Sequence, residues 1–79
     1  MRFVVCGAGA IGGVLGGQLA KAGHEVLFIE KLADHREAIA TQGLQLRGVH
    51  GNHTLRIPTV AQARDVEFRA DDVIFLAVK

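Results

Sequence analysis

The sequence lacks most of what a secreted, membrane-bound or nucleic-acid-binding protein needs. Its 79 residues include one cysteine, so no disulfide can form within the chain. The formal net charge is only +1 and no basic run occurs, which disfavours nucleic acid or an anionic membrane surface as a partner. No charged segment precedes the apolar start, so we expect no signal peptide and a cytoplasmic location.

An apolar run long enough to cross a membrane is also missing. Uncharged residues extend from Phe3 to Gly17, but Gln18 ends this stretch short of the ~20 apolar residues that a membrane helix requires. G-x-x-x-G spacings occur within it, yet each glycine in a helix costs about 1 kcal/mol relative to alanine. Hydrophobic residues make up 49% of the chain and charged residues 22%, which indicates one small globular domain.

What the sequence does have is a glycine motif between an apolar segment, 3–6, and an amphipathic one, 11–22. The pattern is G-x-G-x-x-G, and its setting is typical of a strand, a tight turn and a helix. In a dinucleotide site, the first glycine permits the turn, the second admits a pyrophosphate to the backbone, and the third lets the helix approach the strand. The phosphates then face the N–H groups at the helix start. We therefore predict that the pyrophosphate is bound by Gly7, Ala8, Gly9, Ala10, Ile11 and Gly12.

The first helix is expected over 10–22, with an apolar stripe that faces the sheet. Close packing alone could explain the later glycines of this segment, but it would leave the first two glycines of the motif unexplained. Gly23 is suited to end the helix. The stripe consists of Ile11, Val14, Leu15, Leu19 and Ala22.

A second buried strand, 26–29, ends at two residues of opposite charge. Glu30 lies about where an acidic residue meets the adenosine ribose of a bound dinucleotide, and its carboxylate would accept bonds from the ribose hydroxyls. Lys31 could instead pair with a 2′-phosphate. Successive strand residues point to opposite faces, so we expect only one of the two to address the ribose. By position Glu30 has the better claim, which favours NAD.

The remaining segments predict a helix, a hairpin and a final strand. Asp34 is expected to cap a helix that ends at Gly43, and His35 in its first turn is expected to be solvated. The alternating segments 44–47 and 54–57 predict an antiparallel hairpin, and 73–78 predicts a fully buried strand. Histidines 50 and 53 lack the companions of a metal site, so no metal is expected.

With these features in hand, the chain resembles the N-terminal part of the ketopantoate reductase (2-dehydropantoate 2-reductase) family over all 79 residues. The resemblance implies an oxidoreductase that reduces ketopantoate to pantoate with NADPH, on the route to pantothenate and coenzyme A. Lys31 stands where the family usually has an arginine for the 2′-phosphate, so NADP and NAD both stay open. The resemblance also adds the closing residues Ala77, Val78 and Lys79 to the cofactor site, with Lys79 near the nicotinamide ribose. It is carried by MRFVVCGAGAIGG, AGHEV, GLQLRG, TLRIPTV and DDVIFLAVK.

The family's catalytic lysine and acidic residue lie in a C-terminal helical domain, so no catalytic residue is assigned in this chain. Residues 1–79 are therefore interpreted as the N-terminal portion of a dinucleotide-binding domain, and the intact enzyme is expected to act on a small 2-oxo acid. The alternative is a free-standing NAD-sensing regulatory module of the kind found in potassium transport systems.

The predicted fold class is α/β: a partial Rossmann-type, mainly parallel sheet made of one βαβ unit, a β-hairpin and a further strand. The expected strand order is second, first, last, which places the ligand crevice between the first and last strands. The apolar edge of 73–78 is expected to pair with another copy, so we predict a homo-oligomer.

Overall fold

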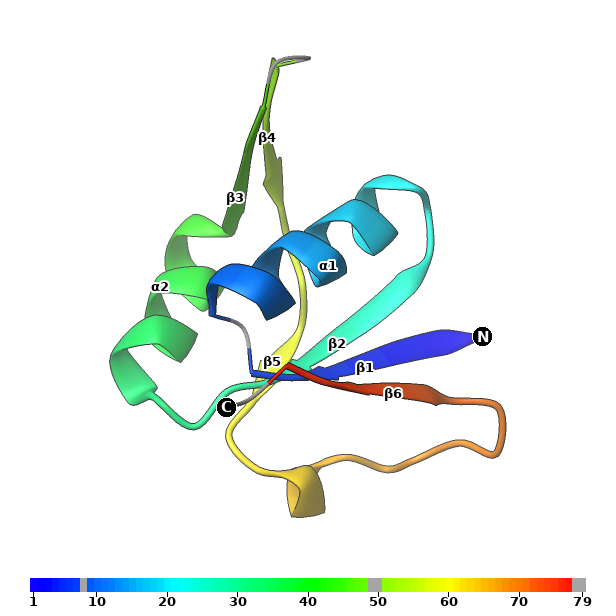
Figure 1. Ribbon diagram of the computed structural model, residues 1–79. Coiled ribbons are helices and arrows are strands. Elements are labelled where there is room, and N and C mark those ends of the chain that lie inside the picture. Colours follow the sequence, from blue (N-terminus) through cyan, green and yellow to red (C-terminus); the bar gives the residue numbers. More distant parts are fainter. Residues whose placement is uncertain (8, 49–50, 78–79) are drawn as a thin grey trace.

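The computed structural model of the chain describes residues 1–7, 9–48 and 51–77. A four-stranded parallel sheet carries two helices and an antiparallel hairpin on one side, and the segment with a short 3₁₀ turn, η1, on the other (Figure 1). The elements are β1 (Arg2–Cys6), α1 (Ala10–Lys21), β2 (Glu25–Ile29), α2 (Ala33–Gln42), β3 (Leu44–Gly48), β4 (Gly51–Leu55), β5 (Thr59–Val60), η1 (Ala63–Asp65) and β6 (Val73–Leu76).

The sheet has the order β5-β2-β1-β6, which confirms the predicted order and adds one strand at its edge. All of its pairings are parallel, with Val4 opposite Leu27 on one side and Ile74 on the other. The added strand, β5, was not predicted because it is only two residues long and directly follows Pro58. Parallel pairing brings the carboxyl ends of β1, β2, β5 and β6 to one edge of the sheet.

The face of α1 that packs on the core is formed largely by glycines together with Leu19, so the predicted apolar stripe is wrong at Ile11 and Val14. Gly12, Gly16 and Gly17 are buried. Ile11 and Val14, by contrast, are 75% and 56% exposed. Glycine lacks a side chain, so this face lets the helix axis lie closer to the strands than leucine or isoleucine would permit.

Gly16 shows how close this packing is. A Cβ built on Gly16 would lie 2.3 Å from the ring of Phe28, whose side chain is fully buried in β2. One turn of α1 therefore rests on the aromatic ring at the centre of the core. The core cluster consists of Val5, Val26, Phe28, Ile39 and Ile57.

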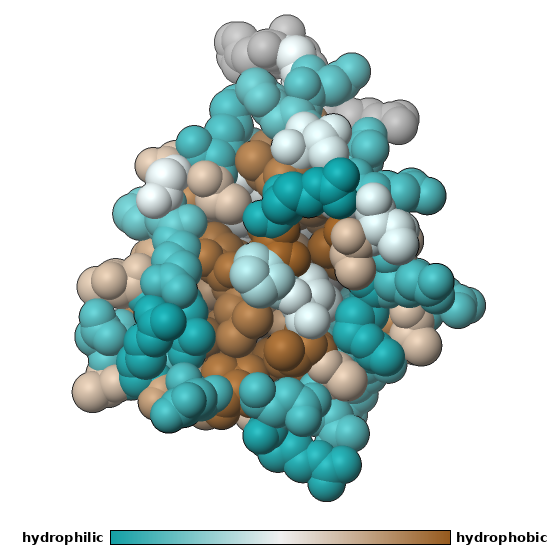
Figure 2. Space-filling model, turned by 180° about the vertical axis from the view of Figure 1, so that it is seen from behind, coloured by the Kyte–Doolittle hydropathy of each residue, from teal (hydrophilic) through white to brown (hydrophobic). Residues whose placement is uncertain are grey.

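The last strand is half-covered rather than fully buried, so that prediction is wrong. Ile74 and Leu76 are 51% and 76% exposed, and they alternate with partly buried residues. Alternation places them on one face of the sheet. From behind, the molecule shows apolar surface across its centre with hydrophilic surface around it (Figure 2).

The hairpin is confirmed, with β3 and β4 paired antiparallel from Leu44 opposite Leu55 to Gly48 opposite Gly51. Its second strand starts and ends earlier than predicted. The start of α2 also differs, because the N-cap is Leu32 and makes no side-chain capping bond, so Asp34 is not the cap. Gly43 does end this helix, with a positive φ of 79°.

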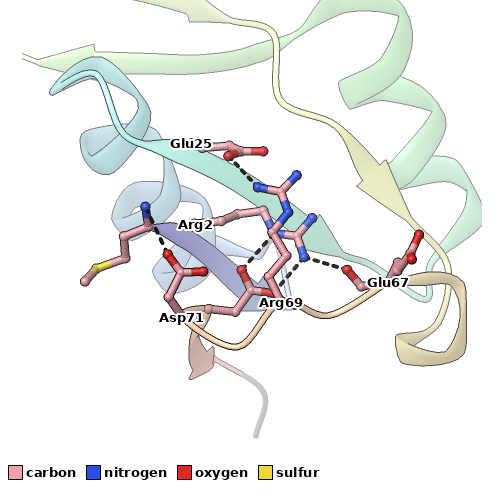
Figure 3. Close-up of polar contacts among 7 residues, drawn as sticks. Arg2, Glu25, Glu67, Arg69 and Asp71 are labelled. Atoms are coloured by element: carbon pink, nitrogen blue, oxygen red, sulfur yellow. Dashed lines mark hydrogen bonds and ion pairs between the residues drawn. The ribbon is translucent and has the colours of Figure 1, made fainter.

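A buried ion pair fastens the connection before β6 to the start of β1. Two nitrogens of Arg2 donate to the two carboxylate oxygens of Asp72 at 3.0 and 2.7 Å, and the side chains are only 10% and 2% exposed. Arg2 also donates to the carbonyl of Glu67 (Figure 3). The backbone N–H of Arg69 donates to the carboxylate of Asp72. The hydrogen bonds to its carboxylate lower the pKa of Asp72 to about 2, and the bond from Arg2 contributes more than the bond from Arg69.

None of the helices in residues 1–7, 9–48 and 51–77 is both long and apolar enough to cross a membrane.

Candidate functional site

The glycine turn lies at the carboxyl ends of three parallel strands. It follows β1 directly, and the N–H of Gly7 donates to the carbonyl of Ile29 at the end of β2 at 2.8 Å. On the other side, the N–H of Ala77 donates to the carbonyl of Cys6 at 2.9 Å. The turn therefore sits between the ends of β2 and β6, where parallel sheets of this type place their ligands.

The three glycines of the motif have different structural roles. Gly7 has a φ of 93°, which disfavours any residue with a side chain. A Cβ on Gly12 would lie 1.7 Å from the carbonyl oxygen of Gly7, so the helix and the turn touch at this point. Gly9 has nothing within 4 Å of its Cβ position. Gly7 and Gly12 are therefore required by the fold, whereas Gly9 keeps open a space above the backbone.

The first turn of α1 presents its backbone N–H groups toward that space. The helix starts at Ala10 with Gly9 as N-cap, and no side chain caps it. The N–H groups of the first helical residues, Ala10, Ile11 and Gly12, have no acceptor within the helix. No acidic residue stands in the first turn, so the positive end of the helix dipole is not offset there. These features suit a phosphate or pyrophosphate group.

Of the three closing residues predicted to border the cofactor, the structure describes Ala77. Its Cβ lies 3.1 Å from the Cβ position of Gly12, so the end of β6 reaches the glycine turn as predicted from the strand order. The predicted site residues Ala8, Val78 and Lys79 lie outside the described residues.

Glu30 is buried and its carboxylate faces the first turn of α2. One oxygen accepts from the N–H of Leu32 at 3.1 Å, and the other lies 3.0 Å from Nδ1 of His35. The sequence predicted a solvated His35, but its Nδ1 lies within hydrogen-bond distance of the Glu30 carboxylate. Lys31, the next residue, is exposed. Because the N–H of Gly7 bonds to Ile29, Glu30 still stands one residue from the glycine turn.

The sequence reasoning missed two cations beside Lys31. A cleft of about 570 Å³ opens between the end of β2, the start of α2 and η1, with Arg36 and Arg64 among its lining residues. Arg64 comes close to Lys31 because β5 pairs with β2. A two-residue strand gives no periodic signal, so neither cation could have been assigned to this place from the pattern.

Within residues 1–7, 9–48 and 51–77, no group of three or more His, Cys, Asp or Glu side chains is placed to hold a metal ion. His53 lies half-buried on β4, and His50 is outside the described residues.

A comparison with family models matches almost the whole chain to one family. The family model described as "Ketopantoate reductase PanE/ApbA" matches residues 3–79. A 2-dehydropantoate 2-reductase of Mesorhizobium japonicum is 39% identical over 79 residues, which are all of this chain and 24% of that protein. The chain therefore spans about a quarter of the length of this curated relative.

Two solved structures are similar in both sequence and fold. The structure of D-mandelate dehydrogenase with NADH and anilino(oxo)acetate has a TM-score of 0.79 and 34% identity, covering 96% of this chain and 25% of the other. The 2-dehydropantoate 2-reductase of Methylococcus capsulatus has a TM-score of 0.75 and 31% identity, covering 94% and 24%.

Proposed function

Because this chain belongs to the ketopantoate reductase family, we propose that it is the dinucleotide-binding part of an oxidoreductase that uses NADH or NADPH to reduce a small 2-oxo acid. The observation that carries the proposal is the geometry of the glycine turn. Gly12 packs directly against the carbonyl of Gly7, whereas the space at the Cβ position of Gly9 is open. A pyrophosphate over Gly9 would accept from the N–H groups that start α1.

The role of the described residues in such an enzyme is binding and orientation. Bound NADH or NADPH would supply a hydride for the carbonyl carbon of a 2-oxo acid such as ketopantoate, and the carbonyl oxygen would take up a proton to give a 2-hydroxy acid such as pantoate. The glycine turn would hold the pyrophosphate, and the end of β6 at Ala77 would border the nicotinamide half. Residues 1–79 are proposed as the N-terminal portion of the dinucleotide-binding domain, and we assign no catalytic residue within them. The catalytic groups are proposed to lie in a C-terminal domain, outside this sequence.

A substrate of this class is supported by the relatives. One similar structure contains NADH together with anilino(oxo)acetate, an oxo acid, bound to a D-mandelate dehydrogenase. The 39% identical relative is a 2-dehydropantoate 2-reductase. Neither relative supports the alternative of a free-standing NAD-sensing module, which we do not pursue.

The test is a calorimetric titration of the 79-residue chain with NADH and NADPH at low salt, repeated with Gly9→Ala. A Cβ at Gly9 fills the space above the turn, so both affinities should fall about tenfold or more, which corresponds to ~1.4 kcal/mol. Thermal unfolding of Gly9→Ala should match the parent, because its Cβ meets no protein atom. Failure of the parent chain to bind either dinucleotide would overturn the proposal.

Glu30 is proposed as the residue that meets the adenosine ribose. Glu30→Gln keeps the shape of the side chain and removes its charge. Weaker NADH binding by this variant, with unchanged unfolding, would support a bond to the ribose hydroxyls. Lower stability with unchanged NADH affinity would show that the carboxylate stabilises the fold and does not bind the ribose.

A further inference from the structure

Three cations stand around one cleft at the end of β2, and no acid is among its lining residues. Lys31 follows the strand, Arg36 is in α2, and Arg64 is in η1. The four ion pairs found in the described part of the chain include none of these three side chains. The cleft is lined by Lys31, Arg36, Ala61, Gln62, Ala63 and Arg64 and has a volume of about 570 Å³.

Two of the cleft's walls are held in place by hydrogen bonds. Nη1 of Arg36 donates to the carbonyls of Glu30 and Lys31 at 3.0 and 3.4 Å, which fixes its guanidinium against the end of β2. The other wall is held by the N–H of Glu30, at the end of β2, which donates to the carbonyl of Val60 in β5 at 2.8 Å. This bond extends the pairing of β5 with β2 and sets where the chain leads into η1.

The turn that carries Arg64 is itself closed by local bonds. The N–H of Gln62 donates to the carboxylate of Asp65 at 3.2 Å, and the N–H of Asp65 donates back to the carbonyl of Gln62 at 3.0 Å. The carboxylate nearest to Arg64 in sequence is thus engaged with the backbone of its own turn. The positive charge of Arg64 remains at the mouth of the cleft, where its side chain is exposed.

The cleft lies where we expect the ribose 2′-phosphate of a bound NADP(H). A dinucleotide with its pyrophosphate on the glycine turn places its adenosine ribose at the end of β2. A phosphate on the ribose 2′-oxygen would extend past Glu30 toward Lys31. The Glu30 carboxylate accepts from the N–H of Leu32, the N-cap of α2, and contacts His35 in the first turn of that helix, whereas Lys31 is exposed. Because the carboxylate is already engaged by these contacts, the case for NAD that its sequence position made is weaker.

We propose that Arg64 is a specificity-determining residue, which reaches from the segment after β5 to bind the ribose 2′-phosphate of NADP(H) together with Lys31 and Arg36. The proposal rests on the function proposed above and narrows the cofactor to NADP(H). Arginine suits this role because its planar guanidinium donates two parallel hydrogen bonds to a phosphate. The contribution of η1 distinguishes the site from one formed by the end of β2 alone.

The test compares Arg64→Gln with Lys21→Gln in the full 79-residue chain. Both variants lose one positive charge, but Lys21 is exposed at the last turn of α1, at the far end of the sheet from the cleft. Arg64→Gln should lower the ratio of NADPH to NADH affinity about tenfold, the size of one charge-assisted bond to a phosphate. Lys21→Gln should leave that ratio unchanged.

Smaller probes locate the effect on the 2′-phosphate itself. The parent chain should bind adenosine 2′,5′-bisphosphate more tightly than adenosine 5′-monophosphate, and Arg64→Gln should remove most of this preference. Inorganic phosphate that competes as well as the bisphosphate would indicate a general anion site and overturn the proposal. So would equal losses in both variants, or an unchanged ratio in Arg64→Gln while both dinucleotides still bind. Binding of neither dinucleotide would instead remove the proposed function as well.

Discussion

Gly12 lies directly against the carbonyl oxygen of Gly7, which would be 1.7 Å from a Cβ at position 12. Real Cβ atoms do not approach a backbone oxygen this closely, so Gly12→Ala must move either the turn or the helix. We expect a loss of about 3 kcal/mol in the free energy of unfolding, measured by urea denaturation.

Gly9→Ala is the matched control for that prediction. Gly9 has a φ of −72° and open space at its Cβ position, so its substitution should change stability by less than about 0.5 kcal/mol. Equal stability of the two variants would contradict the close contact between Gly12 and Gly7.

The contact between Gly16 and Phe28 predicts that Gly16→Ala destabilises the parent protein but not a variant that lacks the Phe28 ring. Gly16→Ala gains helix propensity of about 1 kcal/mol, but its Cβ would meet the Phe28 ring at 2.3 Å, which should cost more than that gain. In a Phe28→Leu background the ring is absent, so the same change should be neutral or stabilising. A double-mutant cycle by urea denaturation measures both. Identical effects of Gly16→Ala in the two backgrounds would show that the helix does not rest on the ring.

The sequence was sufficient for the sheet order and the hairpin but not for the packing of α1. Runs such as 26–29 identify buried strands because every residue is apolar, and the glycine motif locates the turn between the first strand and the helix. Hydropathy assigns the buried face of a helix by its large apolar residues. Here the glycines within α1 are buried, whereas Ile11 and Val14 are exposed. A pattern method cannot detect burial of a residue that has no side chain.

The cationic cleft was out of reach of the sequence for a different reason. Lys31 could be identified from its distance to the glycine motif. Arg64 joins it only through the pairing of β5 with β2, a contact between segments about thirty residues apart that involves two register pairs. The bonds of Glu30 to Leu32 and His35 are likewise set by where α2 begins, which the predicted cap at Asp34 misplaced.

The outward position of Val14 predicts that α1 tolerates polar residues where the sequence suggested a core. Val14→Gln should change the free energy of unfolding by less than about 0.5 kcal/mol, because the side chain is 56% exposed. Leu19, which packs against the core cluster, is the comparison residue on the same helix. Leu19→Gln should cost at least about 1.5 kcal/mol. Similar losses for both variants in urea denaturation would restore the apolar stripe as the packing face.

The Arg2–Asp72 pair predicts a specific dependence of stability on pH. The folded pKa of Asp72 is about 2, below its ordinary value of 3.8, so the pair stabilises the fold fully above pH 3.8. That contribution is lost as the pH falls from 3.8 through 2. Asp72→Asn should therefore be less stable than the parent at pH 7, and the difference should narrow over this range.

Asp71→Asn is the control for the Asp72 prediction, because Asp71 is 66% exposed and its ion pair with the N-terminal amine, at 3.5 Å, is also exposed. Its stability should follow that of the parent at every pH. Urea denaturation from pH 2 to pH 7 measures all three proteins. A constant difference between the parent and Asp72→Asn would mean that the carboxylate charge is not what stabilises the contact.

The exposed edge of β6 predicts self-association of the 79-residue chain. In the described sheet β6 pairs only with β1, and its side chains Ile74 and Leu76 are largely exposed. An apolar edge strand with unpaired backbone groups is a template for pairing with another copy. Sedimentation velocity at rising concentration should show a homo-oligomer, and Leu76→Lys should shift it toward monomer because a charged side chain on an edge opposes pairing. Val14→Lys adds the same charge to an exposed apolar site on α1 and should leave the oligomer intact. A parent chain that stays monomeric at high concentration, or equal dissociation by both variants, would exclude association through this edge.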